Sequence, residues 1–81
     1  MEPVKADQVF DAGDLGCGEL LVLLVKQMKA LAPGQVLQVI TTDPGAAEDL
    51  PAWCRLRGHE LILVETSGGR PSYWIRRAAE G

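Results

Sequence analysis

Cys17 is the residue whose type and position most clearly indicate chemistry, and glycines at 16 and 18 flank it. It follows a short strand-like stretch and a tight turn, and it comes directly before a segment with helical periodicity. The free amides and the dipole at a helix N-terminus favour an anion, so a cysteine there is shifted toward the thiolate. A thiolate can attack a sulfane sulfur, and the same amides would then hold the persulfide anion. Gly16 and Gly18 leave the sulfur sterically open.

Two features of the sequence oppose a reactive Cys17. The neighbouring carboxylate of Glu19 disfavours the thiolate, because a nearby negative charge raises the pKa of a thiol. A cysteine between two glycines can also be an inert small residue at a packed turn. Position alone therefore leaves both interpretations open.

Apart from Cys17, few residues are candidates for a chemical role, and they are one histidine, His59, and a second cysteine, Cys54. Cys54 falls on the expected buried side of the second helix, which predicts a core position. A disulfide between the two cysteines would need their Cα atoms within about 7 Å, and the sequence does not decide this. His59 follows a glycine that should end a helix, so capping or packing is favoured over a general-base role.

We predict neither a metal nor a cofactor. A metal site needs three or four suitably spaced ligands, which this chain cannot easily supply. The glycines at 13, 16 and 18 fit no standard phosphate-binding loop. A stand-alone enzyme is disfavoured because no base accompanies the nucleophile, so any catalysis would be a half-reaction carried out with partners.

Composition predicts one small domain spanning residues 1–81, with an ordered core of about residues 7–78 and fraying ends at Met1–Ala6 and Ala78–Gly81. The net charge of −3, with both signs mixed, argues against direct nucleic-acid binding. The start lacks the order of a signal peptide, and the longest apolar run, Leu20–Val25, is too short for membrane insertion. We therefore expect a cytoplasmic protein with free thiols.

The first half of the chain predicts a strand, a helix and a second strand. The first strand is short, lies around Val9-Phe10, and ends in a turn at residues 13–16. A helix is expected from about Gly18 to Ala32, because Pro33-Gly34 is a strong breaker pair. Residues 35–42 are rich in Val, Ile, Leu and Thr and read as the second strand.

The second half predicts another helical region and a hairpin. Asp43 and Pro44 fit the N-cap and the first helical position. Pro51 cannot donate to the carbonyl four residues back, so either the helix kinks or Asp49 caps a second segment running to Arg57. Gly58 is the expected stop. Residues 60–66 and 72–77 are strands, joined by a turn at residues 67–71.

These elements predict an α/β (α+β) two-layer sandwich of order β-α-β-α-β-β. Both helices should cover one face of a mixed four-stranded sheet.

The first helix divides its apolar residues into two groups. At 100° per residue, a core stripe forms on one side. It consists of Leu20, Leu21, Leu24, Met28 and Leu31. Val22 and Leu23 fall outside that stripe, within about two turns of Cys17. They are candidates for partner contact beside the sulfur, although single exposed aliphatic residues are also normal.

Read together, the motifs resemble the TusA/SirA-like family over nearly the whole chain, from residue 9 to residue 77. In the first half the resemblance rests on Phe10-Asp11-Ala12 before Cys17, then a helix, a Pro-Gly pair and an aliphatic strand. In the second half it rests on Asp43-Pro44, Asp49-Leu50-Pro51, Trp53-Cys54, Gly58-His59-Glu60 and Trp74-Ile75-Arg76. One such element would be weak evidence, but the set lies in the order and spacing of the family.

The resemblance implies a β-α-β-α-β-β sandwich that carries persulfide sulfur on the cysteine matching Cys17. It also implies a cysteine desulfurase or rhodanese as sulfur donor and a downstream acceptor protein, for example in tRNA thiolation. The signature of the family is Cys-Pro-x-Pro, whereas this chain has Cys17-Gly18-Glu19-Leu20. The missing prolines motivate an alternative function, in which the cysteine loop docks a partner or senses redox state without passing sulfur on.

Overall fold

The computed structural model describes residues 5–66 and 71–78, and for Cys17 it describes the backbone alone. Six elements follow one another in the predicted order. They are β1 (Gln8–Gly13), α1 (Cys17–Lys29), β2 (Val36–Thr41), α2 (Ala46–Arg57), β3 (Glu60–Glu65) and β4 (Ser72–Arg76). The fraying expected at the chain ends falls largely on residues 1–4 and 79–81, and the expected hairpin turn falls on 67–70. These residues lie outside the described part of the chain.

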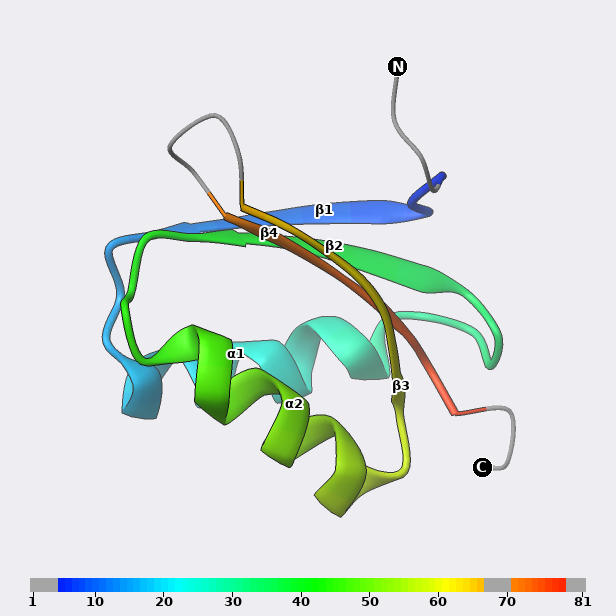
Figure 1. Ribbon diagram of the computed structural model, residues 1–81. Coiled ribbons are helices and arrows are strands. Elements are labelled where there is room, and N and C mark those ends of the chain that lie inside the picture. Colours follow the sequence, from blue (N-terminus) through cyan, green and yellow to red (C-terminus); the bar gives the residue numbers. More distant parts are fainter. Residues whose placement is uncertain (1–4, 67–70, 79–81) are drawn as a thin grey trace.

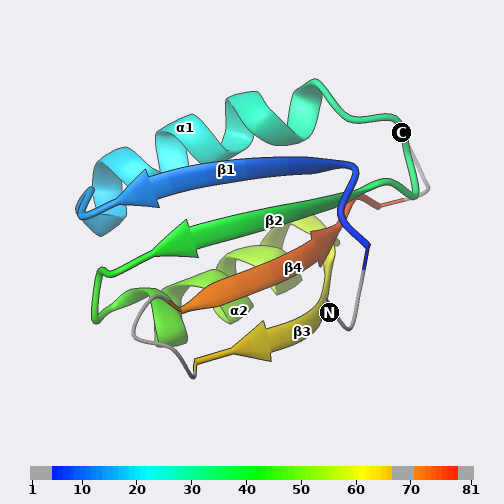
Figure 2. The ribbon, with the colours of Figure 1, turned by 90° about the horizontal axis from the view of Figure 1, so that it is seen from above.

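The strands form one mixed sheet in the order β1-β2-β4-β3 (Figure 2). β1 pairs with β2 in parallel, while β4 pairs antiparallel with both β2 and β3. A parallel pair needs a crossover connection, and α1 supplies it. Both helices lie on the same face of the sheet (Figure 1), which confirms the predicted two-layer sandwich.

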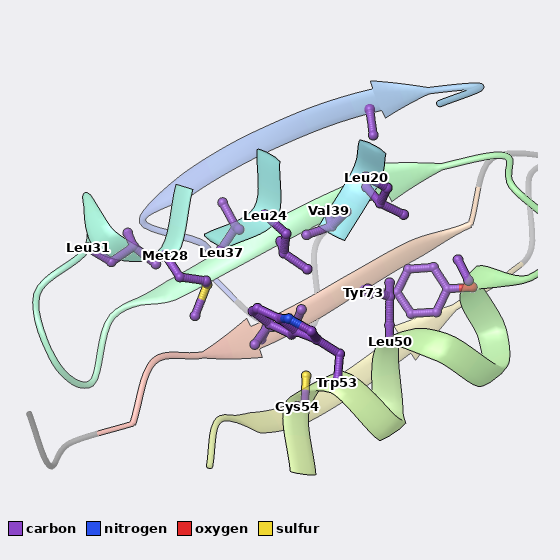
Figure 3. Packing of buried hydrophobic residues seen from close by; sticks show 13 residues of the cluster. Leu20, Leu24, Met28, Leu31, Leu37, Val39, Leu50, Trp53, Cys54 and Tyr73 are labelled. Atoms are coloured by element: carbon purple, nitrogen blue, oxygen red, sulfur yellow. The ribbon is translucent and has the colours of Figure 1, made fainter. Parts of the chain in front are cut away.

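The core lies between the helices and the sheet. β2 supplies its centre, because side chains alternate along a strand and Leu37, Val39 and Thr41 are fully buried on the helix side. The predicted stripe of α1 packs onto this surface, with Leu20 and Leu24 fully buried. Figure 3 shows this packing, with α2 contributing Leu50, Trp53 and Cys54 on the same face of the sheet, beside α1.

Helix α1 ends at Lys29, three residues before the predicted end at Ala32. Its last turn tightens, because the amide of Ala30 is directed to both Gln27 and Met28. Pro33 then disfavours helical backbone at the residue before it. Arg77 donates a hydrogen bond to the carbonyl of Leu31, which fixes the chain after it has left the helix.

Helix α2 begins later than predicted. Its N-cap is Gly45, which makes no side-chain cap, so the predicted cap by Asp43 is wrong. Residues 43–46 instead form a turn, in which the amide of Ala46 donates to the carbonyl of Asp43 at 3.1 Å. The helix continues through Pro51 to Arg57, so Asp49 does not cap a second segment. The bond that Pro51 cannot make belongs to the carbonyl of Ala47, an exposed residue that water can reach.

Gly58 ends α2, as predicted. Its backbone is left-handed, with φ of 79°, a conformation that favours glycine. The amide of Gly58 donates to the carbonyl of Arg55, and that of His59 donates to the carbonyl of Cys54. This pair of bonds is a Schellman motif, which fixes where His59 leaves the helix.

The sandwich has two distinct edges. β1 and β2 end where α1 and α2 begin, and we name this side the Cys17 edge (Figure 1). Both helices end on the other side, which we name the opposite edge. Over 12 residues at 1.5 Å each, α1 separates Cys17 from Lys29 by about 18 Å.

The outer strands of the sheet, β1 and β3, are both irregular. The register shifts between Asp11 and Gly13 in β1, and between Leu61 and Leu63 in β3. No helix among residues 5–66 and 71–78 is long and apolar enough to cross a membrane.

Candidate functional site

Cys17 is the first residue of α1, with Gly16 as its N-cap, so the helix begins one residue before the predicted start at Gly18. The first helical hydrogen bond joins the amide of Leu20 to the carbonyl of Gly16 at 2.8 Å. The amides of Cys17, Gly18 and Glu19 precede that bond, so they are the donors that a helix start offers to an anion. Gly16 supplies no side chain that could cap them.

The turn before Cys17 is fastened to the end of β2. The amide and the hydroxyl of Thr42 both donate to the carbonyl of Gly13, at 2.8 and 3.0 Å. Gly13 itself has a φ of 61°, which few residues other than glycine adopt. Its amide donates to the carboxylate of Asp11 at 3.1 Å. These bonds hold in place the segment that leads into α1.

Gly16 and Gly18 leave open space around the Cys17 backbone. A Cβ atom built on either glycine meets no heavy atom within 4 Å. Neither residue has a positive φ, so the backbone at these positions does not require glycine. The openness expected from the sequence is therefore present in the backbone, and substitution at Gly18 is sterically allowed.

Carboxylates surround the two helix starts at the Cys17 edge. Glu19 lies in the first turn of α1, and Glu48 and Asp49 lie in that of α2. Acidic residues stabilise helix N-termini, but they also oppose a thiolate. Burial, and then the charge of Asp43, raise the pKa of Tyr73 on the adjoining strand. Glu19 is the carboxylate in the first turn of the helix that Cys17 begins.

Cys54 is a free cysteine in the core, as predicted, with 2% of its surface exposed. It lies near the C-terminal end of α2, whereas Cys17 begins α1. Burial raises the pKa of the Cys54 thiol to about 11. A neutral, enclosed thiol is a poor nucleophile, so Cys54 is not suited to sulfur chemistry near neutral pH.

The two partner-contact candidates on α1 differ in exposure. Val22 is 60% exposed, while Leu23 is half-buried and only partly available to a partner. Sequence reasoning missed Leu56 on α2, which is 83% exposed. The signal in the sequence was that Leu56 falls outside the helix face that contains Leu50 and Trp53. Within the described residues, no three His, Cys, Asp or Glu side chains gather where they could hold a metal ion.

The family model described as Sulfurtransferase TusA matches residues 8–77. The chain belongs to the TusA sulfurtransferase family. The matched segment covers all six elements of the fold and includes Cys17.

Curated relatives align over nearly their whole length and are named sulfur carrier protein TusA. One from Pseudomonas aeruginosa (strain LESB58) is 40% identical over 76 residues, covering 94% of this chain and 96% of the relative. One from Pseudomonas putida (strain GB-1) is 40% identical over 80 residues, covering 99% and 100%. A third, from Pseudomonas entomophila (strain L48), is 42% identical over 74 residues, covering 91% and 92%.

Proposed function

We propose that this protein is a sulfur carrier that accepts sulfane sulfur as a persulfide on Cys17 and relays it to an acceptor protein. The observation that carries this proposal is the TusA family match over residues 8–77, with the cysteine at the start of α1. The relatives named as sulfur carriers support it, since they cover nearly the whole chain.

Loading is a transfer between two thiols without net oxidation. The Cys17 thiolate attacks the outer sulfur of a persulfide on the donor, and a new S–S bond forms at Cys17. The donor's own S–S bond breaks, and its cysteine leaves as a thiolate. Unloading repeats the step, with a thiolate of the acceptor attacking the outer sulfur on Cys17 and restoring the Cys17 thiolate.

The residues around Cys17 have separate roles in this proposal. The first-turn amides stabilise the thiolate and then the persulfide anion. Gly16 and Gly18 give a partner's active site access to the sulfur, because no atoms lie where their side chains would be. Glu19 opposes the anion and so keeps the persulfide from being held too tightly to be passed on.

The sulfur donor in this proposal is a cysteine desulfurase or a rhodanese, and the transfer takes place in the cytoplasm, where thiols stay reduced. The acceptor is a downstream protein with a thiol of its own. Val22 is the first candidate for donor contact, because it is apolar, exposed and within about two turns of Cys17. Leu23 is the second, through the part of its side chain that remains exposed.

The test is intact-mass analysis after incubation with a cysteine desulfurase and cysteine, or with a rhodanese and thiosulfate. The wild type should gain the mass of one sulfur atom, which a reductant removes. Cys17→Ser should gain nothing. Cys54→Ser, the matched control, should load as the wild type does.

Loading of Cys17→Ser together with failure of Cys54→Ser would reverse the assignment of the two thiols. An unloaded wild type, with both donors active on another acceptor, would refute sulfur carriage. The redox-sensing alternative would then be examined by looking for a reversible oxidation of Cys17.

A further inference from the structure

A cavity of about 310 Å³ lies at the opposite edge, remote from Cys17. Four parts of the fold line it: the last turns of α1, the last turns of α2, the connection from α2 to β3, and the segment that follows β4. The lining residues are Val25, Met28, Lys29, Trp53, Arg57, His59, Arg77 and Ala78. A space of this volume is at the lower end of the range that holds small organic ligands.

The lining is cationic although the protein is acidic. Lys29, Arg57 and Arg77 account for three of the eight Lys and Arg residues, in a chain with net charge −3. No Asp or Glu is among the described lining residues. Within residues 5–66 and 71–78, Lys29 and Arg57 form no ion pair. The cavity thus concentrates positive charge that no described acid neutralises.

Stabilisation of helix ends does not by itself explain this cluster. Cations do complement the negative end of a helix dipole, and Lys29 and Arg57 are in last turns. The terminal carbonyls, however, already have other donors. Those of Cys54 and Arg55 in α2 accept from the amides of His59 and Gly58, and those of Gln27 and Met28 in α1 accept from the amides of Ala30 and Leu31. Among the described residues, the side chains of Lys29 and Arg57 make no hydrogen bond to these carbonyls.

His59 adds a directed donor and an aromatic wall. Its Nδ1 accepts a hydrogen bond from the amide of Ala78 at 3.0 Å, so the neutral ring carries its proton on Nε2. The ring lies 5.4 Å from that of Trp53, tilted by 39°. Trp53 and Met28 form the apolar floor, and Figure 3 shows both at the same end of the core. The cavity offers charge at its rim and apolar surface beneath.

We infer that this cavity, which we name the cationic pocket, binds a small organic anion with an oxyanion head and an apolar or aromatic body. Lys29, Arg57 and Arg77 hold the head, and Nε2–H of His59 donates to it. The body packs on Trp53 and Met28. This inference does not depend on sulfur carriage, because the pocket shares no residue with the Cys17 edge.

The first test is an NMR titration with benzenesulfonate, whose charge is constant near neutral pH. The indole N–H signal of Trp53 should shift and saturate. That of Trp74 should not move, because alternation along β4 places Trp74 on the sheet face away from the helices. Benzenesulfonate should bind more tightly than sulfate, which lacks the body, and than benzyl alcohol, which lacks the charge. Benzyl alcohol binding as well as benzenesulfonate would overturn the inference.

Single substitutions test which cationic side chains bind the head of the anion. Arg57→Gln and Lys29→Gln should each weaken benzenesulfonate binding about tenfold, as expected for a lost hydrogen bond to a charged group. Arg55→Gln is the matched control: it removes the same charge two residues away, outside the lining, and should change affinity less than about twofold. Equal losses in all three variants would mean general charge attraction and would refute the pocket. Absence of benzenesulfonate binding to the wild type would also refute it.

The protonation of His59 gives an independent readout. Burial, and then the charges of Arg77 and Arg57, lower the pKa of His59 from its ordinary value of 6.5. The amide of Ala78 donates to Nδ1, which cannot accept once it is protonated, so this bond also favours the neutral imidazole. A bound sulfonate adds a negative charge there and must raise the pKa of His59. By linkage, benzenesulfonate should then bind more tightly as the pH falls through that pKa, and an unchanged pKa at saturation would contradict the inference.

Discussion

The two edges of the sandwich differ in which hydrogen-bond donors they present. At the Cys17 edge, two helices begin without side-chain caps, and glycines surround the cysteine. At the opposite edge, the terminal carbonyls are capped, and Gly58 and Arg77 fix the chain around the cationic pocket. Backbone amides are exposed at one edge, whereas side-chain cations are exposed at the other. The two helices would thus offer an anion the first-turn amides of α1 at one edge and side-chain cations at the other.

The largest expected effect compares the two cysteines. At pH 8, a thiol with a pKa of about 11 is ionised in only about one molecule in a thousand. Iodoacetamide should therefore modify Cys17 at least about a hundredfold faster than Cys54, as measured by peptide mapping over time. Because the pKa of Cys54 is raised, its reactivity should increase through pH 9 and 10.

Urea provides the control, since Cys54 must become reactive once the chain unfolds. Comparable rates for the two cysteines in the folded protein would mean that the core opens around α2. The predicted difference in reactivity between Cys17 and Cys54 would then be wrong.

A smaller effect concerns the apolar rim beside the sulfur. Val22→Lys should slow sulfur exchange with the donor roughly tenfold, because it places a charge at the contact, while the midpoint of thermal unfolding stays nearly constant. Val64→Lys, at an exposed position on β3, is the matched control and should exchange normally. Exchange unaffected by Val22→Lys in a folded protein would exclude this contact.

Leu23→Lys tests whether Leu23 serves partner contact or packing within the fold. Its half-buried side chain should make this variant less stable, by about 1 to 3 kcal/mol, since a charge is partly removed from water. The sequence could not distinguish it from Val22, because both lie outside the core stripe and the difference arises only from the packing around the helix.

The smallest expected effect concerns the backbone freedom of Gly18 at the Cys17 edge. Gly18→Pro removes one of the three first-turn amides, so it should retain sulfur loading through those of Cys17 and Glu19. It should also raise the free energy of unfolding by up to about 1 kcal/mol, because the chain loses freedom mainly in the unfolded state. The Gly18 amide precedes the first helical bond, so the helix loses no hydrogen bond. Urea denaturation of both proteins measures the difference.

Gly18→Ala is the companion variant, since it adds helix propensity without restricting the preceding residue. Stabilisation by alanine but not by proline would locate a backbone clash at Cys17. Destabilisation by both would show that the backbone at this position differs from an ordinary first helical turn.

Much of the fold follows from local sequence signals. The aliphatic run around Val39 predicted a buried strand, and the apolar spacing around Leu24 predicted the covered side of α1. Gly58 predicted the end of α2, because a left-handed backbone favours glycine. The end of α1 was placed too late, since the hydrogen bond from Arg77 to Leu31 joins segments that are distant in sequence.

The candidate functional residues also differ in whether a local sequence signal predicts them. The position of Cys17 at a helix start could be predicted, because the turn, the flanking glycines and the helix are contiguous in the chain. Asp43 was mistaken for a helix cap, because a turn placed the cap two residues later, at Gly45. The cationic pocket gave no local signal: Lys29, Arg57 and Arg77 meet only when two helices and the segment after β4 are packed together.

The irregular outer strands have a consequence for solution behaviour at high concentration. A sheet with open edges can grow by hydrogen bonding to a second copy, and regular, uncharged edges do so most readily. Here β1 and β3 each contain a register shift, which bends the strand and interrupts the row of free backbone groups. Edge-to-edge pairing of two copies is thus disfavoured, which suits a sulfur carrier, since its donor and its acceptor must each reach it.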